Sequence, residues 1–77
     1  MFDLNLVSAG HIRHYSIALA GSAGWEARLE ENRAVRWRET YADWHRVERT
    51  LARLEREVED LIEHGWTVQP VGEPASR

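Results

Sequence analysis

The chain has 77 residues, a formal net charge of −3, no Cys and no Lys, so that its ten basic residues other than His are all Arg. A chain of this length forms one domain with a small core. Without Cys there is no disulfide framework, thiolate metal site or Cys nucleophile, and without Lys there is no Schiff-base or P-loop lysine. The slightly acidic balance argues against a general nucleic-acid binder, which usually carries a basic patch.

The amino-terminal sequence and the distribution of apolar residues predict a cytoplasmic protein. Residues 1–10 lack the basic segment and the continuous apolar run of a secretion signal. No stretch approaches the roughly 18 consecutive apolar residues that a membrane-spanning helix needs. We therefore expect neither secretion nor insertion into a membrane.

Residues 1–20 show two alternating patterns of apolar and polar side chains. Phe2, Leu4 and Leu6 alternate with polar neighbours, which predicts either a strand or an extended arm within residues 1–10. The alternation is clearer in residues 11–20, where Tyr15, Ile17 and Leu19 share one face. This second pattern predicts a strand.

Two further strands follow, separated by turn sequences. The segment 21–24 contains two glycines, which suit a short hairpin connection. Trp25, Ala27 and Leu29 then share one face of a predicted strand, and a turn is expected at Glu31 and Asn32. In the strand after it, Val35 and Trp37 should face the same way. The predicted unit is a three-stranded antiparallel meander, four-stranded if residues 1–10 add a strand.

The second half of the chain predicts a long amphipathic helix. The sequence of residues 40–43 has the form of an amino-terminal cap, and Gly65 is placed as a carboxy-terminal cap. Between them the apolar residues recur in steps of three and four at Trp44, Val47, Leu51, Leu54, Val58 and Leu61. The fold class expected is α+β, with this helix packed on the sheet. Residues 1–69 form the domain, and residues 70–77, rich in Pro, Gly and Ser, form a disordered tail.

A parallel coiled coil is the alternative interpretation of the helical stripe. The positions that flank the stripe include Asp43, Glu48, Glu55 and Glu57, so acidic side chains would face acidic side chains in a parallel homodimer. A meander also needs something to cover its apolar face. Packing of the helix on its own sheet is therefore favoured.

The charges of the helix are unevenly distributed and mark the first candidate interaction surface. Basic residues occupy its first two thirds and acidic residues its end, the reverse of what the helix dipole favours. Local pairs such as Arg53 with Glu57 and Arg56 with Asp60 would offset part of this cost. A solvated face explains the pattern, and so does an antiparallel second copy with Ala52 near the crossing point. The candidate surface consists of Arg46, Arg49, Arg53, Arg56, Glu59, Glu63 and Trp66.

The arginines of the strands mark a second candidate surface, for nucleic acid. Arg28, Arg36 and Arg38, with His14, fall at outward strand positions and could grip a single strand of nucleic acid. Glu26 and Glu30 dilute this charge. The four Trp, which a nucleic-acid platform would need for base stacking, are expected in the core, with Trp66 the most exposed of them.

The histidines and serines give no pattern of a metal or catalytic site. His11 and His14 should point to opposite faces of a strand, and His45 and His64 lie near opposite ends of the helix. No nucleophile motif accompanies the serines. We therefore expect no cofactor, no metal and no enzymatic activity. The leading hypothesis is a protein–protein interaction module that homodimerises or binds another protein, with nucleic-acid binding as the alternative.

Overall fold

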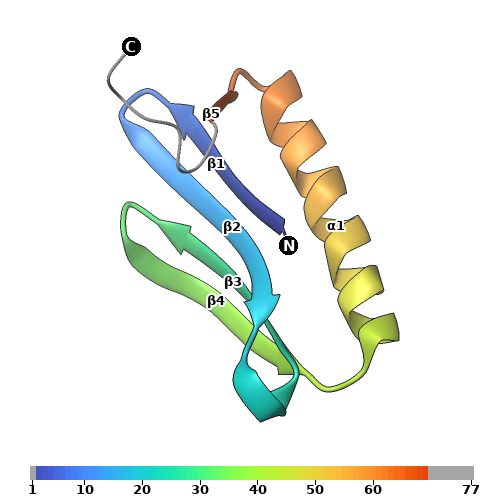
Figure 1. The fold of residues 1–77 in the computed structure, drawn as a ribbon. Coiled ribbons are helices and arrows are strands. Elements are labelled where there is room, and N and C mark those ends of the chain that lie inside the picture. Colours follow the sequence, from blue (N-terminus) through green and yellow to red (C-terminus); the bar gives the residue numbers. More distant parts are fainter. Residues whose placement is uncertain (1, 70–77) are drawn as a thin grey trace.

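The computed structural model describes residues 2–69, which form one antiparallel sheet and one long helix (Figure 1). Met1 and residues 70–77, and with them the predicted tail, lie outside the described residues. The α+β class is confirmed, but the sheet has five strands rather than three or four. The elements are β1 (Phe2–Ser8), β2 (His11–Leu19), a short 3-10 helix (Gly21–Ala23), β3 (Trp25–Glu31), β4 (Ala34–Tyr41), α1 (Trp44–Glu63) and β5 (Thr67–Gln69).

The sheet has the strand order β4-β3-β2-β1-β5. The first four strands form the predicted meander, and residues 1–10 contribute a full strand to it rather than an arm. The fifth strand was not predicted: the chain leaves α1, returns to the sheet and pairs β5 with β1, placing Val7 opposite Thr67 and Asn5 opposite Gln69. The strand ends there because the next residue is Pro70, which has no backbone N–H to donate.

Two of the connections are two-residue turns in which both central residues have positive φ. Ala9 and Gly10 have φ of 49° and 85°, and Asn32 and Arg33 have φ of 52° and 73°. This is the backbone of a type I′ turn, whose twist matches that of the flanking strands. The turn expected at Glu31 and Asn32 is therefore displaced by one residue.

The connection between β2 and β3 differs from the tight hairpin turn that its glycines predicted. Residues Gly21–Ala23 form one turn of 3-10 helix, and Gly24 follows with φ of 106°. A Cβ atom at Gly24 would lie 2.3 Å from the backbone oxygen of Tyr41. The glycine is thus required both by its φ and by the close approach of β4.

A β-bulge in β4 reverses the orientation predicted for Val35. Trp37 lies opposite Leu29, but Val35 lies opposite Glu30, so β4 contains one extra residue at this point. A bulge of this kind turns the residues beyond it to the other face. Val35 therefore shares the face of Glu30 and is 53% exposed, instead of packing beside Trp37.

Helix α1 begins and ends at capping residues that the sequence contains. Asp43 is the N-cap and accepts a hydrogen bond from the backbone N–H of His45 at 3.0 Å, so the helix starts at the end of the predicted cap sequence. At the other end Gly65 has φ of 103°, and the N–H groups of Gly65 and Trp66 donate to the carbonyls of Ile62 and Leu61. This is a Schellman cap, which directs the chain back toward β1.

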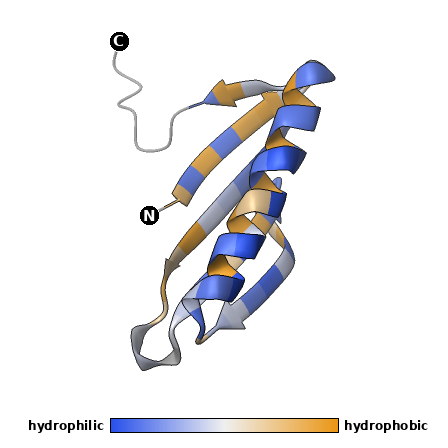
Figure 2. Ribbon diagram, turned by 90° about the vertical axis from the view of Figure 1, so that its right-hand side faces the viewer, coloured by the Kyte–Doolittle hydropathy of each residue, from blue (hydrophilic) through white to orange (hydrophobic). Residues whose placement is uncertain are grey.

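The core lies between α1 and one face of the sheet, as predicted. Figure 2 shows α1 lying over the sheet with hydrophilic residues along its solvent side. The buried side chains are Leu6, Tyr15, Ile17 and Ala27 from the sheet and Val47, Thr50, Leu54 and Val58 from the helix. Two predicted core residues are exposed instead. Trp44, the first residue of the helical stripe, is 41% exposed, and Leu19, at the end of β2, is exposed although Tyr15 and Ile17 on the same face are buried.

Candidate interaction surfaces

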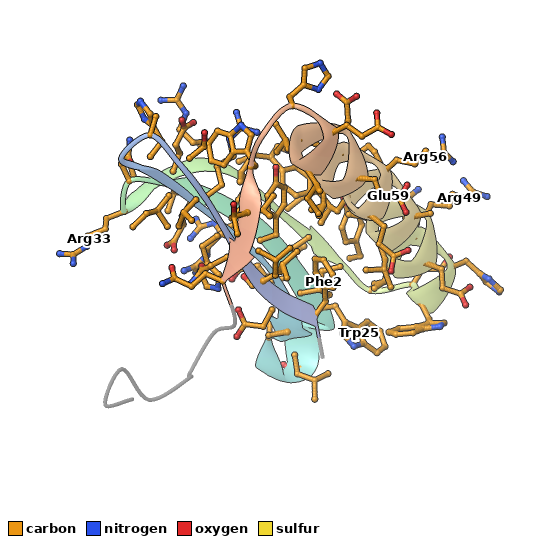
Figure 3. The ribbon with its side chains drawn as sticks, turned by 90° about the horizontal axis from the view of Figure 1, so that it is seen from above. Phe2, Trp25, Arg33, Arg49, Arg56 and Glu59 are labelled. Atoms are coloured by element: carbon orange, nitrogen blue, oxygen red, sulfur yellow. The ribbon has the colours of Figure 1, made fainter. Side chains whose placement is uncertain are left out.

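The outer helix face, defined by Arg46, Arg49, Arg53, Arg56, Glu59 and Glu63, is exposed along the whole of α1. Figure 3 shows Arg49 and Arg56 projecting from the helix away from the sheet. Because α1 buries Val47, Leu54 and Val58, the residues half a turn away form a continuous solvent-facing row. The outermost positions of that row are His45, Arg49, Ala52, Arg56, Glu59 and Glu63.

The charges of this face are not neutralised along the helix. Within residues 2–69, the ion pairs of α1 with its own side chains are His45 with Glu48 and His64 with Asp60. The two expected pairs, Arg53 with Glu57 and Arg56 with Asp60, do not form. The Arg53 guanidinium instead lies over the Trp37 ring, 4.8 Å from its centroid, while Glu57 turns inward.

Glu57 belongs to a polar cluster between α1 and the sheet. The Tyr15 hydroxyl, completely buried, donates to Glu57 Oε2 at 2.7 Å, and Arg13 Nη1 lies 3.4 Å from the same oxygen. Burial and the hydrogen bond to Glu57 raise the pKa of Tyr15 to about 12. The hydroxyl therefore remains a donor throughout the physiological range and links β2 to the helix.

Trp66 lies in this cluster rather than on an open surface. Its ring packs against the core, and the Arg13 guanidinium lies 5.5 Å from the ring centroid. Trp44, not Trp66, is the most exposed of the four tryptophans, and its ring lies 5.2 Å from that of Trp25. Of the residues proposed from sequence for the protein-binding surface, Trp66 is thus the one that stands apart from the outer helix face.

The open sheet face, on the side opposite α1, carries Arg28 and Arg38 of the three arginines proposed for nucleic acid, with carboxylates between them. Arg28 Nη2 lies 3.0 Å from Glu26 Oε1, and Arg28 Nη1 lies 3.4 Å from Glu30 Oε2. Arg38 Nε lies 3.6 Å from Glu26 Oε2. Arg36, predicted on the same face, instead lies 3.8 Å from Glu31, which neighbours Arg13 on the helix side of the sheet, because Arg36 is the extra residue of the β4 bulge. Each of the three guanidinium groups is therefore next to at least one glutamate.

His14 on the same face also contacts two carboxylates. Its ring nitrogens lie next to Asp3 and, at 3.3 Å, to Glu30. Partial burial lowers the pKa of His14, but the hydrogen bonds and charges of Asp3 and Glu30 outweigh it, so the pKa is raised. A concavity of about 420 Å³ adjoins this residue, lined by Asn5, Ile12, His14, Glu30, Asn32 and Arg33.

The outer edge of β4 is a third exposed surface. β4 stands at one end of the strand order and pairs with β3 alone, so its other edge presents unpaired backbone groups. Arg36 and Arg38 stand on this strand, and the bulge interrupts it. Charged side chains and bulges are the features by which edge strands avoid pairing with other chains.

The fourth surface is the α1–β1 groove, formed by Phe2, Leu4, Glu55, Val58 and Glu59. It has a volume of about 300 Å³ and lies on the helix side of the sheet, beside α1. Figure 3 shows Phe2 on the helix side of the sheet at the start of β1. No pattern in the sequence indicates this groove, because it depends on how far α1 reaches across the sheet.

Three further findings bear on function. Within residues 2–69, no three or more His, Asp or Glu side chains come close enough together to hold a metal ion. In the same part of the chain no helix combines the length and the apolar character needed to cross a membrane. Comparisons with protein-family models, with curated proteins and with solved structures find no match for this chain.

Proposed function

We propose that this protein is a non-catalytic interaction module that self-associates through its outer helix face. The observation that carries the proposal is the distribution of charge on that face, which is basic toward the start of α1 and acidic toward its end. Within the described residues, Arg46, Arg49, Arg56, Glu59 and Glu63 take part in no ion pair. These charges are therefore free to pair with another molecule.

An antiparallel second copy would place groups of opposite charge against each other in two of the three kinds of layer on this face. The outermost row has the spacing of a helical seam, so its positions pair in fixed layers when two helices run in opposite directions. One register places Arg49 opposite Glu59, His45 opposite Glu63, and Ala52 opposite Arg56 of the other copy. The same row in parallel would place Arg49 and Arg56 against themselves. Opposite charges in the antiparallel register, and like charges in the parallel one, favour the first.

The expected affinity is low, because the contacts are exposed and polar. Pairing of Arg49 with Glu59, and of His45 with Glu63 when the imidazole is protonated, occurs twice in a symmetric dimer. Exposed ion pairs contribute about 0.2–1 kcal/mol each, whereas association costs at least about 4 kcal/mol. The four ion pairs together at best balance this cost, so the proposal also requires packing of the Arg side-chain stems at the contact. The self-association should be transient and should weaken as salt screens the charges.

Charge exchange tests this arrangement within one chain. Arg49→Glu should weaken self-association, because the introduced carboxylate would face Glu59 of the other copy, and Glu59→Arg should do the same. The double variant restores both contacts with reversed polarity and should recover the native association. Sedimentation equilibrium up to millimolar concentration, at low and high salt, measures the effect. A native protein that stays monomeric at low salt, or a double variant as weak as the single ones, refutes the proposal.

Nucleic-acid binding by the open sheet face is the second candidate. It would require Arg28 and Arg38 to exchange their contacts with Glu26 and Glu30 for phosphates, which lowers the gain from each contact. Binding of a labelled single-stranded oligonucleotide, followed by fluorescence anisotropy, should fall steeply with rising salt if this face is used. Absence of binding at low salt removes this candidate and leaves self-association untouched.

A further inference from the structure

One helix is too narrow to cover a five-stranded sheet. An α-helix with its side chains is about 10–12 Å wide, whereas five strands spaced about 4.8 Å apart span about 19 Å between the outermost axes. The sheet side chains that are completely buried beneath α1 are Leu6 of β1, Tyr15 of β2 and Ala27 of β3. At the start of β1, before its pairing with β5, Phe2 and Leu4 are only partly buried, and the α1–β1 groove lies there.

The floor of this groove is apolar and continues beyond the concavity itself. Phe2 and Leu4 form the sheet side, and Val58 forms the base of the helix wall. Ile62 follows Val58 by one helical turn and is 42% exposed. Val68, opposite Leu6 on the same face of the sheet, is also 42% exposed. The apolar surface therefore extends alongside α1 toward β5.

The helix wall of the groove carries two carboxylates spaced by one turn. Glu55 and Glu59 line the groove above Val58, and neither takes part in an ion pair within residues 2–69. An apolar floor beside two free carboxylates complements a segment that is apolar on one side and basic on its flank. The i, i+4 spacing of the carboxylates matches basic residues at the same spacing on a neighbouring helix.

We propose that the α1–β1 groove binds an amphipathic helix of another protein, with apolar residues on Phe2, Leu4 and Val58 and Arg or Lys side chains at Glu55 and Glu59. Such a helix would lie beside α1 in the same layer and complete the cover of the sheet. This site is distinct from the proposed self-association surface, with which it shares Glu59 alone.

Neither residues 70–77 nor the outer helix face of a second copy combines an apolar side with a basic flank. Residues 70–77 contain one large apolar side chain, Val71, and one basic residue, Arg77. The outer helix face of a second copy presents Arg but no large apolar residue along its outermost row. The occupant is therefore assigned from the lining of the groove itself: a separate amphipathic helix with a basic flank.

Two synthetic peptides serve as probes for this site. Each spans about four helical turns and carries Leu at i, i+3 and i+7. One has Arg, and the other Glu, at two flanking positions four residues apart. The Arg peptide should bind the native protein at least tenfold more tightly than the Glu peptide by anisotropy. It should also shift the methyl NMR signals of Leu4 and Val58.

Charge reversal in the wall of the groove should change this preference. Glu55→Arg should weaken binding of the Arg peptide and favour the Glu peptide, whereas the control Glu48→Arg, on the same helix but outside the groove, should leave the preference unchanged. Circular dichroism verifies that both variants are folded. Arg49→Glu, which tests self-association, should leave peptide binding intact, so the two proposals can fail separately. Equal binding of both peptides, no shift at Leu4 and Val58, or preference for an extended peptide at the edge of β1 would overturn the inference.

Discussion

The two glycines in the connection between β2 and β3 both have positive φ, but only one of them also lacks space for a side chain. Gly24 combines a φ of 106° with a backbone oxygen 2.3 Å from where its Cβ would be. Gly21, with φ of 63°, has no atom within 4 Å of the corresponding position. A side chain at Gly21 would be disfavoured only by the positive φ, whereas a side chain at Gly24 would also collide with the backbone of β4.

The ionisation of His14 should couple to stability as the pH rises through neutrality. Its pKa in the folded protein is raised above the unfolded value, because Asp3 and Glu30 favour the imidazolium form. Protonated His14 thus stabilises the fold. That stabilisation is fully present below the unfolded pKa, about 6.5, and is lost as pH rises through the folded pKa.

The free energy of unfolding should therefore fall as pH rises from about 6 to above the folded pKa of His14. In His14→Gln this part of the pH dependence should disappear. Urea unfolding of both proteins across this range measures the difference. If the free energies of unfolding of the native protein and of His14→Gln change equally with pH, then Asp3 and Glu30 do not raise the pKa of His14.

The behaviour of single residues was the part of the fold that the sequence predicted least. The inward orientation of Tyr15, Ile17 and Ala27 follows from strict alternation and is confirmed. The predicted orientation of Val35 is wrong, because a bulge adds one residue to the strand and turns the residues before it to the other face. The alternation of apolar and polar residues in the sequence does not show that extra residue. The pairing of Arg38 with Glu26 depends on the register of β4 against β3, whereas Arg28 lies between Glu26 and Glu30 on the same strand, as their alternation predicts.

At the level of elements, α1 is held on the sheet by a polar contact as well as by apolar packing. The Tyr15 hydroxyl from β2 reaches Glu57 on α1, and Arg13 joins the same carboxylate. Hydrogen bonds to a charged group contribute more than neutral ones. This contact fixes the rotation of the helix about its axis, and with it the direction of the outer helix face.

Tyr15→Phe should lower the free energy of unfolding by about 1–3 kcal/mol. The substitution keeps the buried ring but removes the donor from the Glu57 carboxylate. Tyr41→Phe is the matched control, because the Tyr41 hydroxyl contacts Glu39 at 3.3 Å in an exposed position and should contribute little. Chemical denaturation gives both values. Equal losses in the two variants would mean that the Tyr15 hydroxyl has no special part in holding α1.

The elements themselves were largely predictable, with one exception. The helix and the meander follow from long periodic patterns and from the caps at Asp43 and Gly65. The exception is β5, whose three residues are too few for a period of two to be recognised. Its pairing with β1 comes from the direction in which the Schellman cap releases the chain, and that is a property of the folded helix. The α1–β1 groove was missed for a related reason, since it depends on the width of α1 relative to the finished sheet.

For the whole molecule, solubility depends on how the long edge of β4 is protected. β4 has eight residues, among them the apolar side chains Val35, Trp37 and Tyr41. Without the basic side chains of Arg36 and Arg38, and without the bulge, its free edge would offer a template for pairing with other chains. The opposite edge of the sheet is short, because β5 has three residues. Protection is therefore concentrated where the edge is longest.

Replacing Arg36 and Arg38 together by Thr should accelerate aggregation several-fold, because Thr favours strands and the charges that oppose edge pairing are lost. The matched control replaces Arg49 and Arg56 of α1 by Thr and removes the same charge from a helical surface. Light scattering and thioflavin binding at equal concentration follow both proteins. Aggregation that is as fast in the helix variant would attribute the effect to net charge rather than to the edge of β4.

The pairing of β5 with β1 also has a consequence for the order of biosynthesis. Val7 and Thr67 are neighbours across the sheet although sixty positions (67 − 7) separate them in the chain. On the ribosome, the backbone groups of Asn5–Val7 that will pair with β5 emerge early and must wait until α1 has emerged and its final turn has formed. Closure over so long a loop carries a larger entropic cost than any pairing within the meander. The pairing of β5 with β1 is therefore expected to follow the formation of the meander and of the helix cap.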